Sequence, residues 1–175
     1  MHTVTFWWGS PGNLLSRDPV EVRGIVAVLD EWLRGPGRRL LHGRRFVALG
    51  RWAELCPELG PAIRAASAGP VDPEAPTLAL LMAYDGRDEL RDAAARVGGG
   101  ADAAAFAAAL WTGSLTPVDL VLRTGGDAHL SAGFLLWQIA EARLAFTPTL
   151  WPALTPAALR RHLARARSVT RRYGR

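Results

Sequence analysis

Two patterns of apolar positions alternate along the chain. Short apolar runs, which are typical of strands, cover residues 4–8, 40–49, 78–82 and 118–122. Stretches with helical periodicity or helix-forming composition cover residues 18–33, 57–68, 88–97, 101–110, 131–145 and 155–172. Strands that alternate with helices predict an α/β fold, with an open, mostly parallel sheet flanked by helices. We expect a single domain over residues 1–175.

Glycine and proline mark the connections between these elements. Residues 9–13 form a turn-rich loop after the first strand, and residues 35–37 (Gly-Pro-Gly) end the first long helix. Residues 98–100 are three consecutive glycines and the best linker candidate. Because this run is too short to separate domains, we expect it to join two helices.

Polar residues follow three of the predicted strands. Asn13 follows the first strand, residues 84–87 (Tyr-Asp-Gly-Arg) follow the third, and residues 123–126 (Arg-Thr-Gly-Gly) follow the fourth. Ligands of parallel α/β sheets gather beyond the carboxyl ends of the strands. We therefore expect these polar groups to meet at one edge of the sheet.

The segment after the fourth strand has the residue types of an anion site. Arg123 supplies a permanently charged, forked donor that suits phosphate. Gly125 and Gly126 allow backbone amides to approach the same group. Taken alone, these residues favour a simpler interpretation, an ordinary strand, turn and helix with an arginine at the surface.

A hydrolase triad is the first alternative for this loop. Asp127, His129 and Ser131 have the required residue types, but alternating residues of one loop point apart. The Gly-x-Ser-x-Gly turn that would expose a nucleophilic serine is also absent from the sequence. We reject this interpretation.

A metal site is the alternative for the acidic residues near the third strand. Asp85, Asp88, Glu89 and Asp92 lie close together in sequence. The amino terminus of a helix, which favours negative charge, explains the same residues without a metal. We expect this second explanation to hold and predict no metal ligands in this chain.

Composition narrows the functional classes. All 21 basic residues are arginine, so the net charge of +5 reflects coding bias as much as an acidic partner. These arginines are dispersed without an aromatic-basic signature, and we expect no nucleic-acid binding. Cys56, the single cysteine, excludes an internal disulfide. With no secretory signal or apolar membrane span, we expect a soluble, cytoplasmic protein with at most peripheral membrane contact.

Longer motifs indicate a family. Residues 117–126, followed by Phe-Leu-Leu-Trp at 134–137 and Phe-Thr-Pro-Thr-Leu-Trp-Pro at 146–152, resemble the C-terminal half of the cis-prenyltransferases, the undecaprenyl diphosphate synthase family. Residues 78–90 resemble the family's apolar strand and its Tyr-Gly-Gly-Arg-Asp-Glu turn. The terminal Arg172-Tyr-Gly174 matches the family's Arg-x-Gly motif, and residues 4–22 show a weaker likeness to its Ser-x-Asn-Trp segment.

The resemblance assigns roles to residues of this chain. It implies transfer of a prenyl group from an allylic diphosphate, with Asn13 as the active-site asparagine. It also implies that Arg123, His129 and Ser131 hold the diphosphate of isopentenyl diphosphate, beside Gly125 and Gly126. His129 departs from the family, which ordinarily has arginine there. A neutral imidazole donates one hydrogen bond, so phosphate binding should be weaker or displaced; the alternative is a loop histidine without a ligand.

Three further departures concern the allylic site. The family's opening strand and its Asp-Gly-Asn-Gly-Arg-Trp-Ala loop, which supplies the magnesium-binding aspartate, have no counterpart in the sequence. The carboxylate expected in a helix after Phe-Leu-Leu-Trp is Arg143. The tryptophan after the active-site asparagine is Leu14. Because magnesium neutralises the departing diphosphate, we expect no autonomous allylic site in this chain.

These departures predict a dependent subunit. Arg172 and Gly174 would reach across a dimer interface to a complete cis-prenyltransferase subunit, which would hold the Mg²⁺. The acceptor would be isopentenyl diphosphate or a small, aromatic compound of a specialised pathway. Two alternatives stay open: an autonomous divergent prenyltransferase that uses Asn13, Arg123 and Asp85, and a non-catalytic module that binds prenyl diphosphate or regulates an enzyme.

Overall fold

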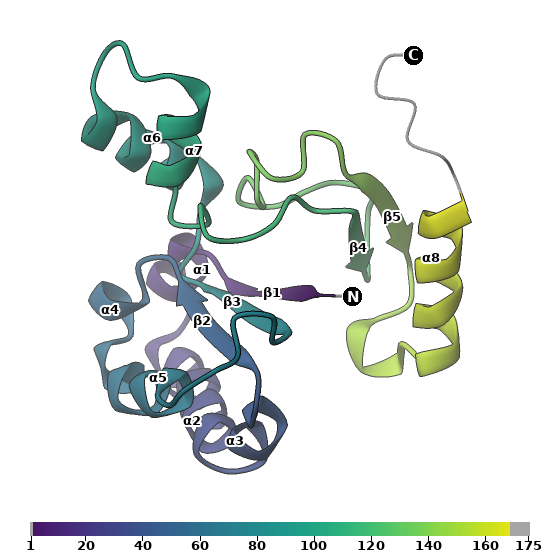
Figure 1. The fold of residues 1–175 in the computed structure, drawn as a ribbon. Coiled ribbons are helices and arrows are strands. Elements are labelled where there is room, and N and C mark those ends of the chain that lie inside the picture. Colours follow the sequence, from purple (N-terminus) through teal and green to yellow (C-terminus); the bar gives the residue numbers. More distant parts are fainter. Residues whose placement is uncertain (1, 169–175) are drawn as a thin grey trace. The chain divides into compact units, whose positions relative to one another are not determined.

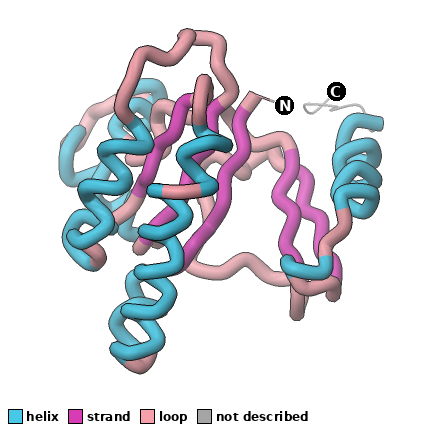
Figure 2. Tube along the Cα trace, turned by 90° about the horizontal axis from the view of Figure 1, so that it is seen from below, coloured by secondary structure: helices cyan, strands magenta, loops and turns pink. Residues whose placement is uncertain are grey.

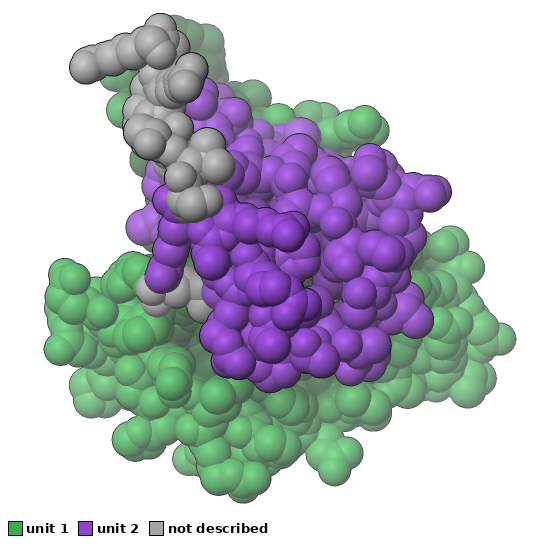
Figure 3. Space-filling view, turned by 90° about the vertical axis from the view of Figure 1, so that its right-hand side faces the viewer, with its two compact units in different colours: residues 1–115 green, residues 116–175 purple. Residues whose placement is uncertain are grey.

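The computed structural model describes residues 2–168. The chain forms two compact units, residues 1–115 (unit 1) and residues 116–175 (unit 2) (Figure 3). Parallel strands form the centre of each unit. The predicted α/β class, with parallel strands flanked by helices, is confirmed (Figure 2).

Unit 1 contains a three-stranded parallel sheet (Figure 1). Its order is β1 (Thr3–Gly9), β3 (Thr77–Met82) and β2 (Arg45–Leu49). The central strand β3 is buried along nearly its whole length, because both of its neighbours are hydrogen-bonded to it and helices cover the sheet. This explains why β3 has a continuous apolar sequence instead of an alternating one.

The helices of unit 1 follow the order that the pattern predicts, with three short additions. They are α1 (Pro11–Ser16), α2 (Pro19–Arg34), α3 (Pro36–Leu41), α4 (Trp52–Leu55), α5 (Gly60–Ser67), α6 (Gly86–Val97) and α7 (Ala103–Ala109), with a 3₁₀ turn η1 at Pro57–Leu59. The main core lies between α2, α5 and the sheet, and it includes Leu29, Leu33, Leu59, Ile63 and Leu80. The glycine run at 98–100 joins α6 to α7, as predicted.

A glycine fixes the turn that follows β2. Gly50 has φ +113°, and a Cβ atom on it would lie 2.2 Å from the carbonyl oxygen of Met82 at the end of β3. Both the positive φ and the close approach exclude a side chain at this position. The segments that follow β2 and β3 therefore leave the sheet close to each other.

Glu89 holds the turn that follows β3. Its carboxylate accepts hydrogen bonds from the Tyr84 hydroxyl (2.5 Å) and from the Thr112 amide and hydroxyl (2.7 Å each). Glu89 is 1% exposed, and Tyr84 and Thr112 are fully buried. This buried network joins the first turn of α6 to the segment after α7.

Unit 2 contains a two-stranded parallel sheet of β4 (Leu120–Thr124) and β5 (Arg143–Thr147). Leu120 lies opposite Arg143 in the register, and the pairing continues to Thr124 and Thr147. A 3₁₀ turn η2 (Trp151–Ala153) and helix α8 (Pro156–Ser168) follow β5. The backbone of Arg143 also donates to the carbonyl of Asp119 (3.1 Å), which extends this pairing by one residue.

The predicted helix over residues 131–145 is wrong. Residues 132–141 form successive turns, and β5 occupies residues 143–147. The backbone has positive φ at Ala132 (+50°), Gly133 (+54°) and Leu135 (+49°). A right-handed helix cannot pass through left-handed residues, so helical periodicity in this stretch does not produce a helix.

The other boundaries differ less. The strand predicted over residues 40–49 begins at Arg45, because α3 continues to Leu41. The last helix begins at Pro156, close to the predicted position. Within residues 2–168, no helix is both long and apolar enough to cross a membrane.

Candidate functional site

The carboxyl end of β4 brings three of the predicted site residues together. Arg123, the fourth residue of β4, is half-buried, and its Nη1 donates a hydrogen bond to Ser131 Oγ (2.9 Å). His129 Nε2 lies 3.4 Å from the same Oγ atom. Ser131 therefore links the arginine to the histidine. The expectation that alternating residues of this loop point apart is wrong for His129 and Ser131. We call Arg123, His129 and Ser131 the anion cluster.

Arg123 has unused donor capacity in this cluster. Its Nε atom is buried and has no hydrogen-bond partner among the described residues. A buried N–H without an acceptor is costly, and an oxyanion is the acceptor that the guanidinium fork matches best. The side chain is thus held by Ser131 at Nη1, whereas its buried Nε–H has no acceptor among the described residues.

The glycines after β4 fix the course of the loop. Gly125 and Gly126 have φ +66° and +91°. The amide of Gly125 donates to the carbonyl oxygens of Thr147 and Thr149 (2.9 Å each), and a Cβ on Gly125 would lie 2.8 Å from Leu150 Cδ2. Gly125 therefore anchors the cluster loop to the segment after β5, whereas Gly126 is exposed. A direct contact of either glycine with a phosphate stays a prediction.

Arg143 occupies a structural position. It is the first residue of β5, and its Nη1 donates a hydrogen bond to the carbonyl oxygen of Ala166 on α8. The side chain joins the sheet of unit 2 to its last helix. At the position where the family resemblance places a carboxylate, this chain has a cation that is hydrogen-bonded to the backbone of α8.

Asn13 lies in unit 1, in the short helix α1 that follows β1. Its Oδ1 accepts hydrogen bonds from the backbone amide and the hydroxyl of Ser10 (3.1 Å each), and the backbone amide of Asn13 donates to Ser10 Oγ (3.1 Å). This reciprocal cap begins α1 and fixes the side chain of Asn13. Ser10 was not predicted, although a serine three residues before an asparagine is a recognisable capping signal. Arg172 and Gly174 lie outside the described residues.

Carboxylates near the end of β3 already have cationic partners. Asp88 lies 3.2 Å from Arg91 and 3.8 Å from Arg51, and Asp85 caps the amino terminus of α6. Arg51 also hydrogen-bonds Glu54, which lowers the pKa of that carboxyl. The described residues contain no group of three or more His, Cys, Asp or Glu side chains that could hold a metal.

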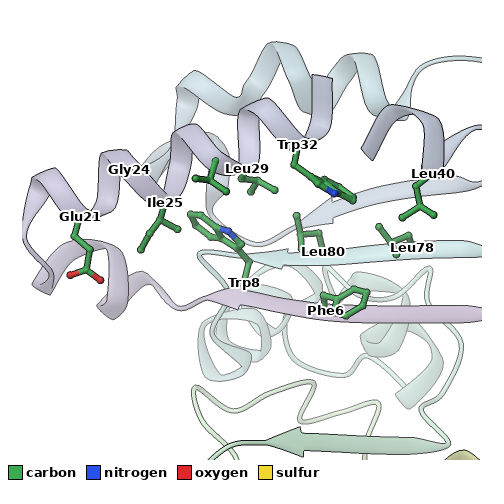
Figure 4. A pocket seen from close by; sticks show the side chains of 11 residues that line it. Phe6, Trp8, Glu21, Gly24, Ile25, Leu29, Trp32, Leu40, Leu78 and Leu80 are labelled. Atoms are coloured by element: carbon green, nitrogen blue, oxygen red, sulfur yellow. The ribbon is translucent and has the colours of Figure 1, made fainter. Parts of the chain in front are cut away.

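A large apolar pocket lies in unit 1, between α2, α3 and one face of the sheet (Figure 4). Its volume is about 710 Å³. Its lining residues are Phe6, Trp8, Glu21, Gly24, Ile25, Val28, Leu29, Trp32, Leu40, Leu78 and Leu80. Glu21, at one end in Figure 4, is the only charged residue of this lining.

Sequence reasoning missed this pocket, although the signal was present. Phe6 and Trp8 on β1, and Leu78 and Leu80 on β3, follow the two-residue period of one sheet face. The α2 side chains of the lining follow a period of three to four residues. Such patterns predict an apolar layer between helix and sheet, but they do not reveal that the layer is incompletely filled.

Fold and site together define a class: an α/β protein with an arginine-centred anion cluster and a separate apolar pocket. Residues 1–174 match the family model described as putative undecaprenyl diphosphate synthase. The chain belongs to this family, the cis-prenyltransferases.

Relatives and solved structures agree with this assignment. The chain is 30% identical to an isoprenyl transferase of Geobacter sulfurreducens over 91% of this chain and 69% of the relative. It is 34% identical to an isoprenyl transferase of Caulobacter vibrioides over 91% of this chain and 65% of the relative. The chain thus spans about two thirds of the length of these relatives.

Two crystal structures have the same fold. Lavandulyl diphosphate synthase from Lavandula x intermedia, in complex with dimethylallyl diphosphate, superposes with a TM-score of 0.88 at 28% identity, over all of this chain and 80% of that one. A probable undecaprenyl diphosphate synthase from Campylobacter jejuni gives 0.81 at 26% identity, over 99% of this chain and 83% of that one.

Proposed function

We propose that this protein is a prenyltransferase subunit that acts on a prenyl diphosphate. The anion cluster is the observation that supports this most strongly, because Arg123 combines a fixed position with a buried, unpartnered Nε–H. The ligand it fits is a phosphate or diphosphate oxygen. Membership in the cis-prenyltransferase family makes a prenyl diphosphate the substrate class.

The apolar pocket of unit 1 supports the same substrate class. Its aromatic and aliphatic lining suits a hydrocarbon chain and offers almost nothing to a polar one. A prenyl diphosphate contains such a hydrocarbon chain, so the lining of this pocket agrees with the substrate class. The lavender relative was crystallised with a ligand of this class, dimethylallyl diphosphate.

The subunit depends on a partner for ionisation of the allylic diphosphate. Arg143 supports this step of the proposal, because its guanidinium holds Ala166 and brings positive charge where a carboxylate is expected. The carboxylates near β3 are likewise engaged by arginines. The magnesium ion therefore belongs to a complete cis-prenyltransferase subunit with which this chain forms a heterodimer.

The acceptor is isopentenyl diphosphate or a small aromatic compound. His129 supports a changed acceptor, because its imidazole occupies a position where the family resemblance expects a second guanidinium. Fewer charged donors at the cluster favour an acceptor that carries less negative charge.

The test is a transfer assay on three samples: this chain alone, a complete family member from the same cell, and their co-purified mixture. We expect labelled prenyl product from the mixture at a rate, or with an acceptor, that neither protein shows alone. Turnover by the lone chain at a rate comparable to the mixture would support an autonomous enzyme. Diphosphate binding without turnover in any sample would support a non-catalytic module.

A matched pair of variants connects the assay to the cluster. Arg123→Lys retains the charge but loses the fork, and it should slow the mixture by roughly 10–100-fold. Arg91→Lys, at an exposed arginine of α6, changes the same residue type on the surface of unit 1 and should have no effect. Equal rates for both variants would contradict the assignment of the cluster.

A further inference from the structure

The positive charge of this chain is concentrated near its C-terminus. Residues 156–175 contain seven arginines and no acidic residue, whereas residues 1–155 contain 14 arginines and 16 acidic residues. The net charge of the protein therefore comes from the last 20 residues of the sequence. The expectation that the arginines are dispersed along the chain is therefore wrong for this segment.

Helix α8 turns its arginines to one side. Ala158, Leu159, His162, Leu163 and Ala166 are half-buried, and they repeat every three to four residues along the side that packs within unit 2. The remaining side is exposed and carries Arg160, Arg161, Arg165 and Arg167. The hydrogen bond from β5 to the carbonyl of Ala166 fixes the helix in this orientation.

Three of the exposed arginines lack acidic partners. Arg160, Arg161 and Arg167 make no ion pair with any residue between positions 2 and 168. The arginines of α2 and α6 differ, because several of them pair with carboxylates on the same helix. The outer face of α8 is thus a strongly basic surface.

Large apolar side chains lie shortly before this helix. Leu150 is 67% exposed and Trp151 is 53% exposed, and α8 begins at Pro156. Exposed tryptophan and leucine beside clustered arginines are typical of segments that lie on a membrane surface. Arginines alone would also suit nucleic-acid phosphates, but a phosphate backbone offers no apolar partner for the exposed Leu150.

We propose that the arginine face of α8, with Leu150 and Trp151, docks this protein onto a bilayer that contains anionic lipid. The arginines contact the headgroups, and the two apolar side chains enter the interface. Each arginine near such a surface contributes additively to binding, and salt screens the attraction. This inference does not depend on the enzymatic proposal.

The experiment measures co-sedimentation of the full chain with vesicles of phosphatidylcholine alone or mixed with phosphatidylglycerol. We expect binding to the mixed vesicles only, and its loss at high sodium chloride. Arg160→Gln with Arg161→Gln should weaken partitioning roughly 30-fold. Arg38→Gln with Arg39→Gln, at two exposed adjacent arginines of α3, removes the same charge elsewhere and should leave binding nearly unchanged.

Trp151→Ser separates membrane docking from simple charge attraction. It should weaken binding to mixed vesicles without changing the salt dependence, and circular dichroism should confirm that all variants are folded. Equal binding by the α8 and α3 variants would overturn the proposal. Tighter binding to duplex DNA or RNA than to mixed vesicles, lost in the α8 variant, would overturn it in favour of a nucleic-acid surface.

Discussion

Replacement of Glu89 by alanine should strongly destabilise this protein, because it removes the acceptor of a buried hydrogen-bond network. Glu89 is 1% exposed and accepts three hydrogen bonds from Tyr84 and Thr112 at 2.5–2.7 Å. The alanine variant leaves three buried donors without their acceptor. Each such donor costs about 1–3 kcal/mol, so the free energy of unfolding should fall by roughly 3–9 kcal/mol.

A glutamine variant tests the origin of this loss. Glu89→Gln retains an oxygen for Thr112 and places an amide near the Tyr84 hydroxyl, which can accept. It loses only the charge assistance of the carboxylate and should cost about 1–2 kcal/mol. Glu31→Ala, at an exposed position of α2, should stay within about 0.5 kcal/mol of the parent.

The assay is urea denaturation followed by far-ultraviolet circular dichroism, with midpoint and slope fitted for each variant. The expected order of stability is parent and Glu31→Ala, then Glu89→Gln, then Glu89→Ala. A loss below about 1 kcal/mol for Glu89→Ala would refute the reasoning, since it would mean that the donors find other partners at little cost.

Three further predictions concern the turn glycines, the cysteine and the anion cluster. Gly50→Ala should cost more than about 3 kcal/mol in thermal or urea unfolding, whereas Gly43→Ala, with φ +68° and no neighbour within 4 Å, should cost about 1 kcal/mol. Burial, with the nearby Glu58 carboxylate, raises the pKa of the Cys56 thiol to about 11. The thiol of the unfolded chain therefore ionises at a lower pH, and the free energy of unfolding should fall as pH rises from about 9 to 11. An equal fall in the Cys56→Ala variant would contradict this. His129→Arg should tighten pyrophosphate binding in calorimetry about 10-fold or more, and Arg123→Met should abolish it; no change in either would remove the cluster from diphosphate binding.

The strands and most helices were predictable because their signals are local. The apolar run of β3 reflects burial on both faces, and Asp18-Pro19 begins α2 as expected. Residues 131–145 show where local signals fail. Their apolar spacing suits a helix, but the left-handed backbone at Ala132 and Leu135 depends on surrounding structure that composition does not report.

In the candidate site, too, local signals were predictable and long-range contacts were not. The family motif named Arg123, His129 and Ser131 together, and their side chains lie side by side in the structure, while their role in binding diphosphate stays a prediction. The burial of Glu89 was not predicted, because an acidic residue in the first turn of a helix is usually exposed. The hydrogen bond of Arg143 to α8 joins residues 23 positions apart, and no local pattern reveals such a partner.

The central claim is that this chain supplies a subunit and that its partner supplies the allylic chemistry. The most direct measurement is the turnover of the co-purified mixture after the aspartate of the partner's Asp-Gly-Asn-Gly-Arg-Trp-Ala loop is replaced by alanine. The account predicts that prenyl transfer disappears while the two chains still co-elute. Transfer that continues at the rate of the unmodified mixture would contradict it, because this chain would then hold an allylic site of its own.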